Sequence, residues 1–498
     1  MDICLYISDQ HSYQVQGYAG NKIIRTPNLD RIVGEGTAFM NAYCAYPVCV
    51  PSRMAMLTGQ YASKISVMSN HGSLNSNIPT FLHALDINGY NTTLCGRMHF
   101  VGPDQRHGFK DRIAGDITQI YNNRPDRIAL ERGVHNKTPQ GGPSSISLVG
   151  GGNSPVLEYD RYVIDKALQF LSEDNQGDQF LCVGTYAPHH PFVAPEELFN
   201  YYYEKVDVPS DSFSYPEHPA LRNNFRDEDP EIVRAVRAAY YGMVEFEDQL
   251  IGKVYDAFND YLKRNNREGI FIYVSDHGEH AGYRGQYGKN TFYEASSHVP
   301  MIFAGTGINK GQKKYGPVSL LDIAPTLIGL TNSPQLPFYD GKDLSYILRS
   351  AQDDTERIVC CETGGNIQMN EFTYGQMAIG LQKKLIHYYG YDDNDILYDL
   401  VKDPDESQNI INENKETADK LRKEIKERLN VPIAKMISEA NKEKAYMKVL
   451  GKCDFDSEEL WHCPENARTL PVPCFRSKKS IETWIKEIEE RKQKEGRL

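Results

Sequence analysis

The segment Cys49-Val50-Pro51-Ser52-Arg53 places a thiol and a guanidinium four residues apart. Pro51 favours the first turn of a helix, where its missing N–H would have no partner. Cys49 would then lie at the amino end of that helix, where free N–H groups and the helix dipole favour negative charge. Arg53, one turn further on, can point back toward it. The pattern predicts a nucleophile beside an anion site; the alternative is a helix that begins at an inert core thiol.

A cysteine phosphatase loop also combines Cys with Arg, but it needs them six positions apart around a loop of free N–H groups. The separation here is four, and Pro51 removes a donor. This alternative is therefore weak.

The longer run from Cys49 to Thr58-Gly59 resembles the sulfatase signature, in which Cys is followed by Pro two residues later, then by a small residue and Arg, and later by Thr-Gly. The resemblance implies that a separate maturation enzyme oxidises Cys49 to formylglycine. In that family the aldehyde is hydrated to a geminal diol, which is the nucleophile.

A second segment, Cys95-Gly96-Arg97-Met98-His99 and the five residues after it, resembles the Gly-Lys-x-His-x-x-Gly element of the family. The likeness is closest to the branch of choline sulfatases and arylsulfatases. Arg97 stands where Lys is usual. Arg keeps the positive charge and offers a planar fork for two oxygens, so the resemblance implies that Arg97 contacts the sulfate.

Asp276-His277 follows a predicted strand, and Asp9-Gln10 follows the first one. The resemblance implies that these four residues, with Cys49, hold a calcium ion. Carboxylate and amide oxygens are ligands that calcium prefers, whereas the imidazole of His277 is a poor one and is included by resemblance alone. The alternative is that both acids are ordinary turn residues at strand ends.

Two further residues complete the resemblance: His189, within Ala187-Pro188-His189-His190-Pro191, and Lys289, thirteen residues beyond Asp276. By resemblance, one hydroxyl of the diol attacks sulfur and forms a covalent sulfate ester. His189 and Lys289 hold the ester and help to protonate the departing alcohol, and His99 then takes the proton of the remaining hydroxyl so that sulfate leaves. Arg53 and Arg97 help to stabilise the developing charge.

The expected substrate is a sulfate monoester of a sugar or glycan fragment. Choline O-sulfate is an alternative, but a quaternary ammonium usually needs an aromatic cage, and both Trp residues lie in the C-terminal tail. A phosphonate or phosphate ester hydrolase of the same superfamily is another, and a catalytically dead binding protein is a third. We expect the substrate pocket to include Arg106, His107, His280 and Arg284.

The polar residues follow short apolar runs that predict strands at 3–7, 91–95, 180–185 and 270–274. Alternation of such runs with helical patterns predicts an α/β fold, with a large mostly parallel sheet sandwiched by helices. The resemblance implies the alkaline-phosphatase-like version of it. Ligands of such sheets bind outside the carboxyl ends of the strands, so one site could collect all these residues.

Three parts are expected along the chain: a catalytic α/β domain over 1–348, a smaller subdomain of antiparallel strands and a helix over 349–430, and a helical extension over 431–498. A long packing helix is predicted from Pro230 to about Leu262. The irregular stretch 104–155 is expected to line a substrate pocket. The resemblance covers roughly the first 430 residues and leaves the extension unexplained.

Composition excludes several classes. The net charge is −12 and no basic stripe occurs, so nucleic acid is not an expected partner, and a local group of cations must attract the anionic substrate. No stretch reaches membrane-spanning length and no leader is seen, so we expect a cytoplasmic protein. The ten scattered cysteines do not indicate a disulfide framework. The extension could mediate a homo-oligomer.

Overall fold

The computed structural model describes residues 1–118, 145–146, 149–208, 217–224, 228–368 and 371–450, together with the single residues 486, 490 and 493. Its centre is an eight-stranded sheet in the order β11-β2-β10-β9-β1-β7-β4-β5. The strands are β1 (Asp2–Asp9), β2 (Gly36–Phe39), β4 (Asn91–Gly96), β5 (Asp111–Ala114), β7 (Gln179–Pro188), β9 (Gly269–Ser275), β10 (Met301–Gly305) and β11 (Gln312–Lys314).

The four predicted strands are confirmed as β1, β4, β7 and β9, which are adjacent in the sheet. Neighbouring strands run parallel except around β10, which is antiparallel to both β2 and β9. The sheet is therefore mostly parallel, as the sequence predicts. Strand β1 is buried along its whole length: Leu5 contacts the core on one face and Tyr6 the core on the other, because successive side chains of a strand point to opposite faces.

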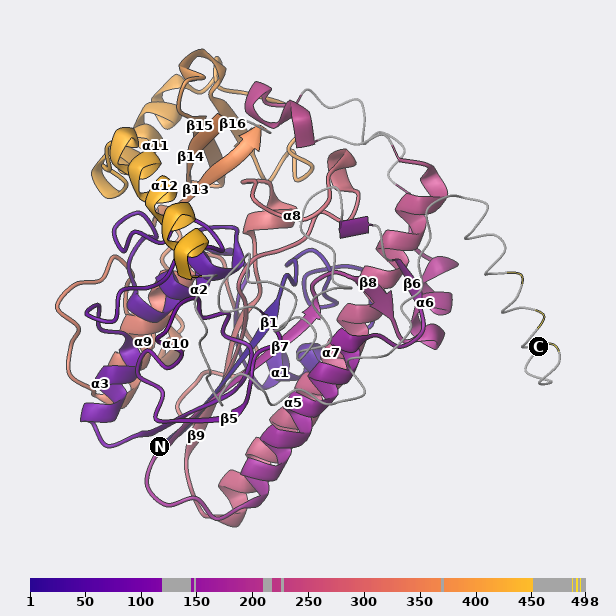
Figure 1. Cartoon of the computed structure of the whole chain (residues 1–498), viewed down its shortest axis with the longest axis vertical. Coiled ribbons are helices and arrows are strands. Elements are labelled where there is room, and N and C mark those ends of the chain that lie inside the picture. The colour runs from indigo at the N-terminus through magenta and orange to yellow at the C-terminus, as the bar shows by residue number, and fades with distance from the viewer. Residues whose placement is uncertain are drawn as a thin grey trace.

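Helices cover both faces of the sheet (Figure 1). One face packs against α1 (Pro27–Glu35), α5 (Pro155–Ser172), α6 (Glu196–Tyr203) and α7 (Pro230–Arg264). The other packs against α2 (Cys49–Thr58), α3 (Phe81–Ile87), α9 (Ile323–Thr331) and α10 (Ser345–Arg349). The predicted long helix is confirmed as α7, which begins with Pro230 after the N-cap Asp229, whose side chain accepts from the Glu231 N–H. A short helix, α8 (Glu294–Ser297), precedes β10.

A four-stranded antiparallel sheet follows, made of β13 (Val359–Gln368), β14 (Glu371–Gly380), β15 (Lys383–Tyr388) and β16 (Ile396–Asp399). Helix α11 (Lys415–Arg428) packs on it. The predicted small antiparallel sheet with a helix is confirmed. Buried Lys384 on β15 ties it to α8, because its Nζ donates to the Phe292 carbonyl (2.8 Å) and pairs with Glu294 (2.5 Å) and Glu406 (2.9 Å).

Two short pairs complete the strands: β3 (Ala42–Tyr43) with β12 (Val318–Ser319), and β6 (Val149–Gly151) with β8 (Phe192–Ala194). The predicted irregular stretch 104–155 contains β5 and β6 at its ends, and its residues 119–144 lie outside the described part. Of the predicted C-terminal extension, the structure describes α12 (Ile433–Leu450), whose Met436 packs with Tyr46 and Met68. The boundaries of the three parts stay predictions.

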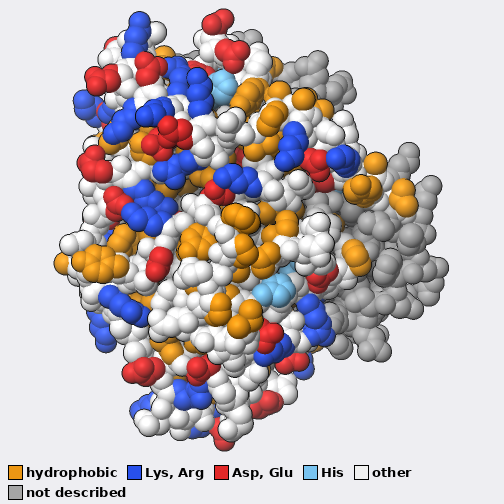
Figure 2. All heavy atoms as spheres, turned by 90° about the vertical axis from the view of Figure 1, so that its left-hand side faces the viewer, with side chains coloured by type: hydrophobic (Ala, Val, Ile, Leu, Met, Phe, Trp, Pro, Cys, Tyr) orange, Lys and Arg blue, Asp and Glu red, His pale blue; other side chains and the backbone are white. Residues whose placement is uncertain are grey.

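Lys and Arg are interspersed with Asp and Glu over the face seen in Figure 2, with hydrophobic side chains between them. This mixed surface agrees with the absence of a basic stripe in the sequence. Among the helices in the described ranges, none combines the length and apolar character needed to span a bilayer.

Candidate functional site

The predicted site residues meet at one edge of the large sheet. Asp9 ends β1 and Asp276 follows β9, while His189 follows β7 and Arg97 follows β4. These strands are neighbours and run parallel, so their carboxyl ends share an edge. Helix α2 begins at the same edge with Cys49, and Pro51 lies in its first turn, as predicted.

The Cys49 thiol is fully buried at the centre of this group. Its Sγ lies 3.2 Å from Nε2 of His277 and 3.2 Å from Nζ of Lys289. His99 and His189 also form hydrogen bonds with the thiol. Four predicted residues of cationic or imidazole type therefore converge on the atom at position 49.

These neighbours decide the charge of the thiol. Burial alone would raise the pKa of Cys49, but Lys289 and His277, together with the hydrogen bond from His189, outweigh it and hold the pKa well below its ordinary value. The site therefore stabilises an anion at position 49. A buried thiol that served only for packing would instead have a raised pKa, as Cys182 and Cys95 have.

Arg53 holds the two carboxylates in place. Its Nε donates to Asp276 Oδ2 (2.7 Å) and its Nη2 to Asp9 Oδ2 (3.2 Å), and all three side chains are buried. Burial raises the pKa of Asp9, but Arg97 and Arg53 lower it more, so the pKa lies below its ordinary value. Asp9 is therefore ionised at neutral pH, as a cation ligand must be.

The ligand atoms of Asp9, Cys49, Asp276 and His277 lie within 4.8 Å of one another, and all four residues are buried. Nδ1 of His277 faces the Gly278 carbonyl (3.0 Å), which can only accept, so this nitrogen carries a proton. Burial lowers the pKa of the ring, but Asp276 raises it more, so the ring presents an Nε2 lone pair only in the neutral state that a bound cation would select. Two carboxylates, a lone pair and the atom at position 49 form a set that fits a divalent cation.

The structure gives Gln10, the fifth predicted ligand, other partners. Its Oε1 accepts from Lys289 Nζ (2.6 Å), and its Nε2 donates to Glu279. Glu279 also accepts from the N–H groups of Ala281 (2.8 Å) and Gly288 (2.6 Å), and burial raises its pKa to about 7. Glu279 and Gln10 thus position Lys289, a role that the sequence reasoning did not assign to Glu279.

Arg97 has a different environment from the one that the resemblance implies. It is 1% exposed, its Nε donates to Asp9 Oδ2 (2.6 Å), and its Nη1 lies 3.5 Å from Asp116 Oδ1. Its Nη2 donates to Nδ1 of His99 (2.9 Å), so a neutral His99 carries its proton on Nε2. The fork that was expected to bind sulfate is already bonded within the chain.

Asp116 was missed by the sequence reasoning. It accepts from the backbone N–H of His99 (2.8 Å) and from the N–H and hydroxyl of Thr118 (2.8 and 2.7 Å), and it also pairs with Arg97. Asp116 thus orients the segment from Arg97 to His99. A lone acid in a turn carries no motif that could have identified it.

His189 and Tyr186 line the β7 side of the site. Nδ1 of His189 faces the His190 carbonyl (2.8 Å) and therefore carries a proton, which leaves Nε2 for the site. The Tyr186 ring lies 4.9 Å from the His189 ring and 4.4 Å from the Arg97 guanidinium carbon.

Asn70 is another residue that the sequence reasoning missed. Helix α2 has no side-chain cap from its own N-cap residue, Val48. The Asn70 Oδ1 accepts from the free Val50 N–H instead (3.0 Å), and its Nδ2 lies 3.8 Å from Cys49 Sγ. Asn70 thus caps the helix that presents the nucleophile.

The four residues predicted for the substrate pocket have other partners in the structure. Arg106 is exposed and donates to the Lys110 carbonyl, and His107 is buried beside Phe100, with Asp104 as its ion-pair partner (3.3 Å). His280 bonds to Thr291 (2.8 Å), and Arg284 pairs with Glu217 (2.8 Å) and donates to the Glu406 carbonyl. Their role in a substrate pocket stays a prediction.

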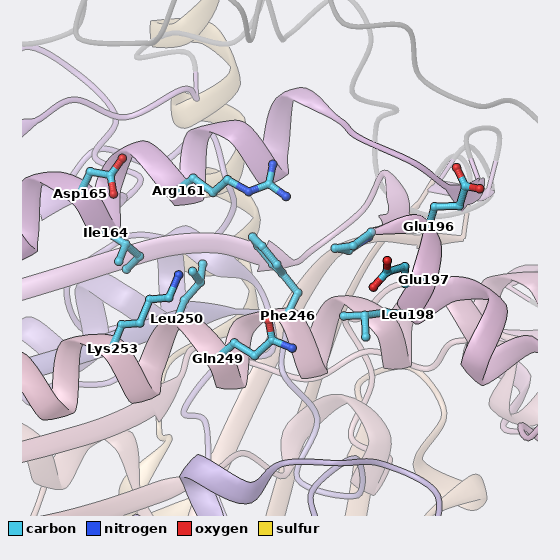
Figure 3. A pocket seen from close by; sticks show the side chains of 11 residues that line it. Arg161, Ile164, Asp165, Glu196, Glu197, Leu198, Phe246, Gln249, Leu250 and Lys253 are labelled. Atoms are coloured by element: carbon cyan, nitrogen blue, oxygen red, sulfur yellow. The ribbon is translucent and has the colours of Figure 1, made fainter. Parts of the chain in front are cut away.

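A hollow of about 460 Å³ lies between α5, α6 and α7 (Figure 3). Arg161, Phe246 and Lys253 are among its lining residues, and it includes none of the residues around Cys49. The converging chemistry at Cys49, and not this hollow, therefore identifies the candidate site.

Two family models match the chain. The model described as Sulfatase matches residues 2–333, and one described as N-sulphoglucosamine sulphohydrolase, C-terminal, matches residues 278–435. The chain is 29% identical over 417 residues to a choline-sulfatase of Rhizobium meliloti, covering 78% of both chains. It is 27% identical over 530 residues to arylsulfatase K of Gallus gallus, covering 99% of this chain and 94% of the relative.

Solved structures share the fold. The structure of BT4656 in complex with its substrate D-glucosamine-2-N,6-O-disulfate has a TM-score of 0.68 at 18% identity, covering 86% of this chain and 97% of that one. A phosphonate monoester hydrolase from Silicibacter pomeroyi has a TM-score of 0.69 at 19% identity, covering 86% of this chain and 94% of that one. The first family model spans well over half of the chain and includes every residue that converges on Cys49, so this chain belongs to the sulfatase family and is an enzyme of sulfate-ester hydrolysis.

Proposed function

We propose that the enzyme hydrolyses a sulfate monoester of a sugar through a formylglycine made from Cys49, with a calcium ion bound beside it. The observation that carries the proposal is the convergence of Lys289, His277, His99 and His189 on one buried atom at the amino end of α2. A packing role for Cys49 would not require four such groups around it.

The calcium ion would be held by Asp9, Asp276 and His277 with the side chain at position 49, and it would supply a positive charge for a sulfate oxygen. Formylglycine would supply a hydroxyl nucleophile in place of the thiol. Lys289, fixed by Gln10, lies beside position 49, where it can bind a sulfate oxygen. The Nδ1–H of His189 donates a hydrogen bond to the His190 carbonyl, so Nε2 is the nitrogen that can exchange a proton with the leaving alcohol.

The ring environment favours a sugar over choline. Binding a quaternary ammonium requires open aromatic faces. The Tyr186 ring, which lies beside the site, is already packed against Arg97 and His189. Residues 119–144 lie outside the described part, so this argument concerns the described residues alone.

A phosphonate or phosphate ester hydrolase is the second candidate, because the same nucleophile and cation could act on either oxyanion. The net charge around position 49 bears on the choice. A phosphate monoester carries about two negative charges at neutral pH and a sulfate monoester carries one. Arg53 and Arg97 are already paired with Asp9, Asp276 and Asp116, so Lys289 is the cation nearest to position 49 in the described part. This charge suits a sulfate monoester better than a phosphate monoester, whereas a phosphonate monoester also carries one charge and is separated by the assay below.

The test is a comparison of kcat/KM on matched aryl sulfate, phosphate and phosphonate esters, followed by sulfated monosaccharides against choline O-sulfate. Protein co-produced with a maturation enzyme is compared with its Cys49→Ala variant as the control. Release of sulfate from a sugar, lost in the variant, is the expected result. Faster turnover of the phosphorus esters, or equal turnover by the variant, would overturn the proposal.

A further inference from the structure

The function proposed above makes no use of α12, the helix that begins the C-terminal extension. Glu443 on this helix is only 7% exposed, and its carboxylate reaches the segment 68–72 of the catalytic part. Its Oε1 accepts from the Met68 N–H (2.5 Å) and its Oε2 from the Ser69 hydroxyl (2.7 Å). A residue more than 370 positions away thus anchors this segment.

The anchored segment forms the turn that carries Asn70. The Ser69 oxygen, which donates to Glu443, also accepts from the His71 N–H (3.1 Å), and the Gly72 N–H donates to the Ser69 carbonyl (3.0 Å). Glu443 therefore holds Met68 and Ser69, which precede Asn70, and through the Ser69 oxygen it also reaches His71 on the other side. Asn70 in turn caps α2 and contacts Cys49 Sγ.

Packing supports the same connection. Met436 of α12 lies in a buried group with Tyr46 and Met68, and Val48, the residue that precedes Cys49, packs against this group. The Tyr46 hydroxyl donates to the Met68 carbonyl (2.7 Å). Helix α12 thus contacts both the turn and the chain segment that enters α2 (Figure 1).

We propose that Glu443 is a positioning residue, which holds the turn 68–72 so that Asn70 caps α2 and contacts the reacting atom at position 49. The chemical role of the atom at position 49 rests on the proposed function; the coupling of α12 to the turn does not. Helix α12 thereby supports the active site and is not only a packing or oligomer element.

An uncompensated buried acid supports this assignment. Burial raises the pKa of Glu443 to about 7, and its partners in the structure are an N–H and a hydroxyl rather than a cation. An apolar residue of similar size would stabilise the fold more than this buried acid does. The hydrogen bonds of Glu443 to the turn therefore explain why an acid stands at this position.

The experiment compares full-length Glu443→Gln and Glu443→Leu, each alone and with Asn70→Ala. The amide of Gln can accept from the Met68 N–H and donate to the Ser69 oxygen, whereas Leu can do neither. Glu439→Leu is the matched control, since Glu439 lies one turn earlier on α12 and pairs with Lys442. Rates are expressed per formylglycine, measured by mass spectrometry in every variant.

We expect Glu443→Leu to lower kcat by about 10- to 100-fold, the usual effect of removing a residue that orients a ligand or nucleophile. Glu443→Gln should stay within about threefold of the parent, and Glu439→Leu should match it. The double variant Asn70→Ala/Glu443→Leu should have a kcat within about twofold of that of Asn70→Ala alone, because Glu443 acts through Asn70. Multiplicative losses in the double variant, or an unchanged kcat in Glu443→Leu, would overturn the proposal.

Hydrogen exchange provides a readout that needs no activity. The amides of residues 68–72 and of the start of α2 should exchange faster in Glu443→Leu than in Glu443→Gln or Glu439→Leu. If the parent hydrolyses no sulfate ester but this difference is present, the proposed function fails and the positioning by Glu443 stands. Equal exchange in all variants overturns the positioning itself.

Discussion

Replacing Arg97 separates two roles for this residue: contact with the substrate, as the family resemblance implies, and positioning of its neighbours, as its contacts indicate. Arg97→Ala removes the 2.6 Å bond to Asp9, the pairing with Asp116 and the donor to His99 Nδ1. Removing one partner of a buried ion pair typically costs about 3–5 kcal/mol.

The lower end of this range applies here, because other donors remain. Asp9 keeps Arg53 at 3.2 Å, and Asp116 keeps the N–H groups of His99 and Thr118. We therefore expect Arg97→Ala to lower the free energy of unfolding by about 3 kcal/mol. Arg97→Lys should lower it by about 1–1.5 kcal/mol, since the charge stays and the fork is lost.

The assay is urea unfolding of each variant, with kcat and KM measured on a small aryl sulfate. Arg31→Ala is the matched control: its pairing with Asp256 is exposed, so the expected loss is below about 1 kcal/mol. Positioning predicts a fall in kcat together with the loss of stability, because His99 loses its donor. A raised KM with stability within 1 kcal/mol of the parent would refute the reasoning and restore Arg97 as a sulfate contact.

The other predictions concern the nucleophile, the cation, the pH dependence and the buried lysine. Active protein should carry formylglycine at Cys49, seen as a peptide roughly 18 Da lighter; full activity of the unmodified thiol would contradict this. Exhaustive chelation should abolish turnover and lower the Tm, with calcium restoring both, whereas unchanged turnover in metal-free protein would exclude a catalytic cation. Stability should fall as pH rises from 5 to 7 and then level off, measured by urea unfolding from pH 5 to 9, because three raised carboxyl pKa values outweigh two lowered histidine pKa values over this range. The raised pKa values of Asp160, Glu279 and Glu443, each about 7 through burial, give contributions that are full below the ordinary carboxyl pKa and are lost as pH rises through 7. Burial lowers the pKa of His11 to about 4 and of His280 to about 3, and their contributions are lost as pH falls below the ordinary value of 6.5. Each proton by which the folded and unfolded states differ changes the free energy of unfolding by about 1.4 kcal/mol per pH unit. A free energy of unfolding that rises steadily to pH 9 would show the carboxyl assignments to be wrong. Lys384→Met should lower the free energy of unfolding by about 3–5 kcal/mol, because Glu294 and Glu406 lose their shared buried cation, whereas Lys342→Met, at an exposed pair with Asp354, should change it little.

Much of the fold follows from local sequence patterns. The central strands are buried on both faces, so they appear as short apolar runs, and their polar successors are forced to the carboxyl edge of the sheet. The antiparallel direction of β10 could not be predicted in this way. It depends on the path of the chain between β9 and β10, which places α8 at the site edge of the sheet without a full crossover helix.

The site was predictable where the family spacing specifies it, and less so where single residues are brought in by tertiary packing. Asp116, Asn70, Glu279 and Glu443 come from four separate segments, and each acts through hydrogen bonds to another residue's backbone or side chain. The predicted role of His107 in a substrate pocket stays a prediction. It was proposed because it lies in a polar, glycine-rich stretch, and in the structure its ring lies 4.8 Å from the Phe100 ring.

The central position of β1 has a consequence for the order of events during synthesis. The strand is made first, yet both of its neighbours, β7 and β9, are made much later, and 275 − 49 = 226 positions separate Cys49 from the end of β9. At ribosomal rates of about 5–20 residues per second, that length takes roughly 10–45 s. Throughout this interval the sheet edge that buries Cys49 does not exist, so the thiol stays exposed. The proposed oxidation therefore has a limited time window, which closes when β9 pairs with β1, and slower translation of residues 50–275 should increase the fraction of chains that are converted.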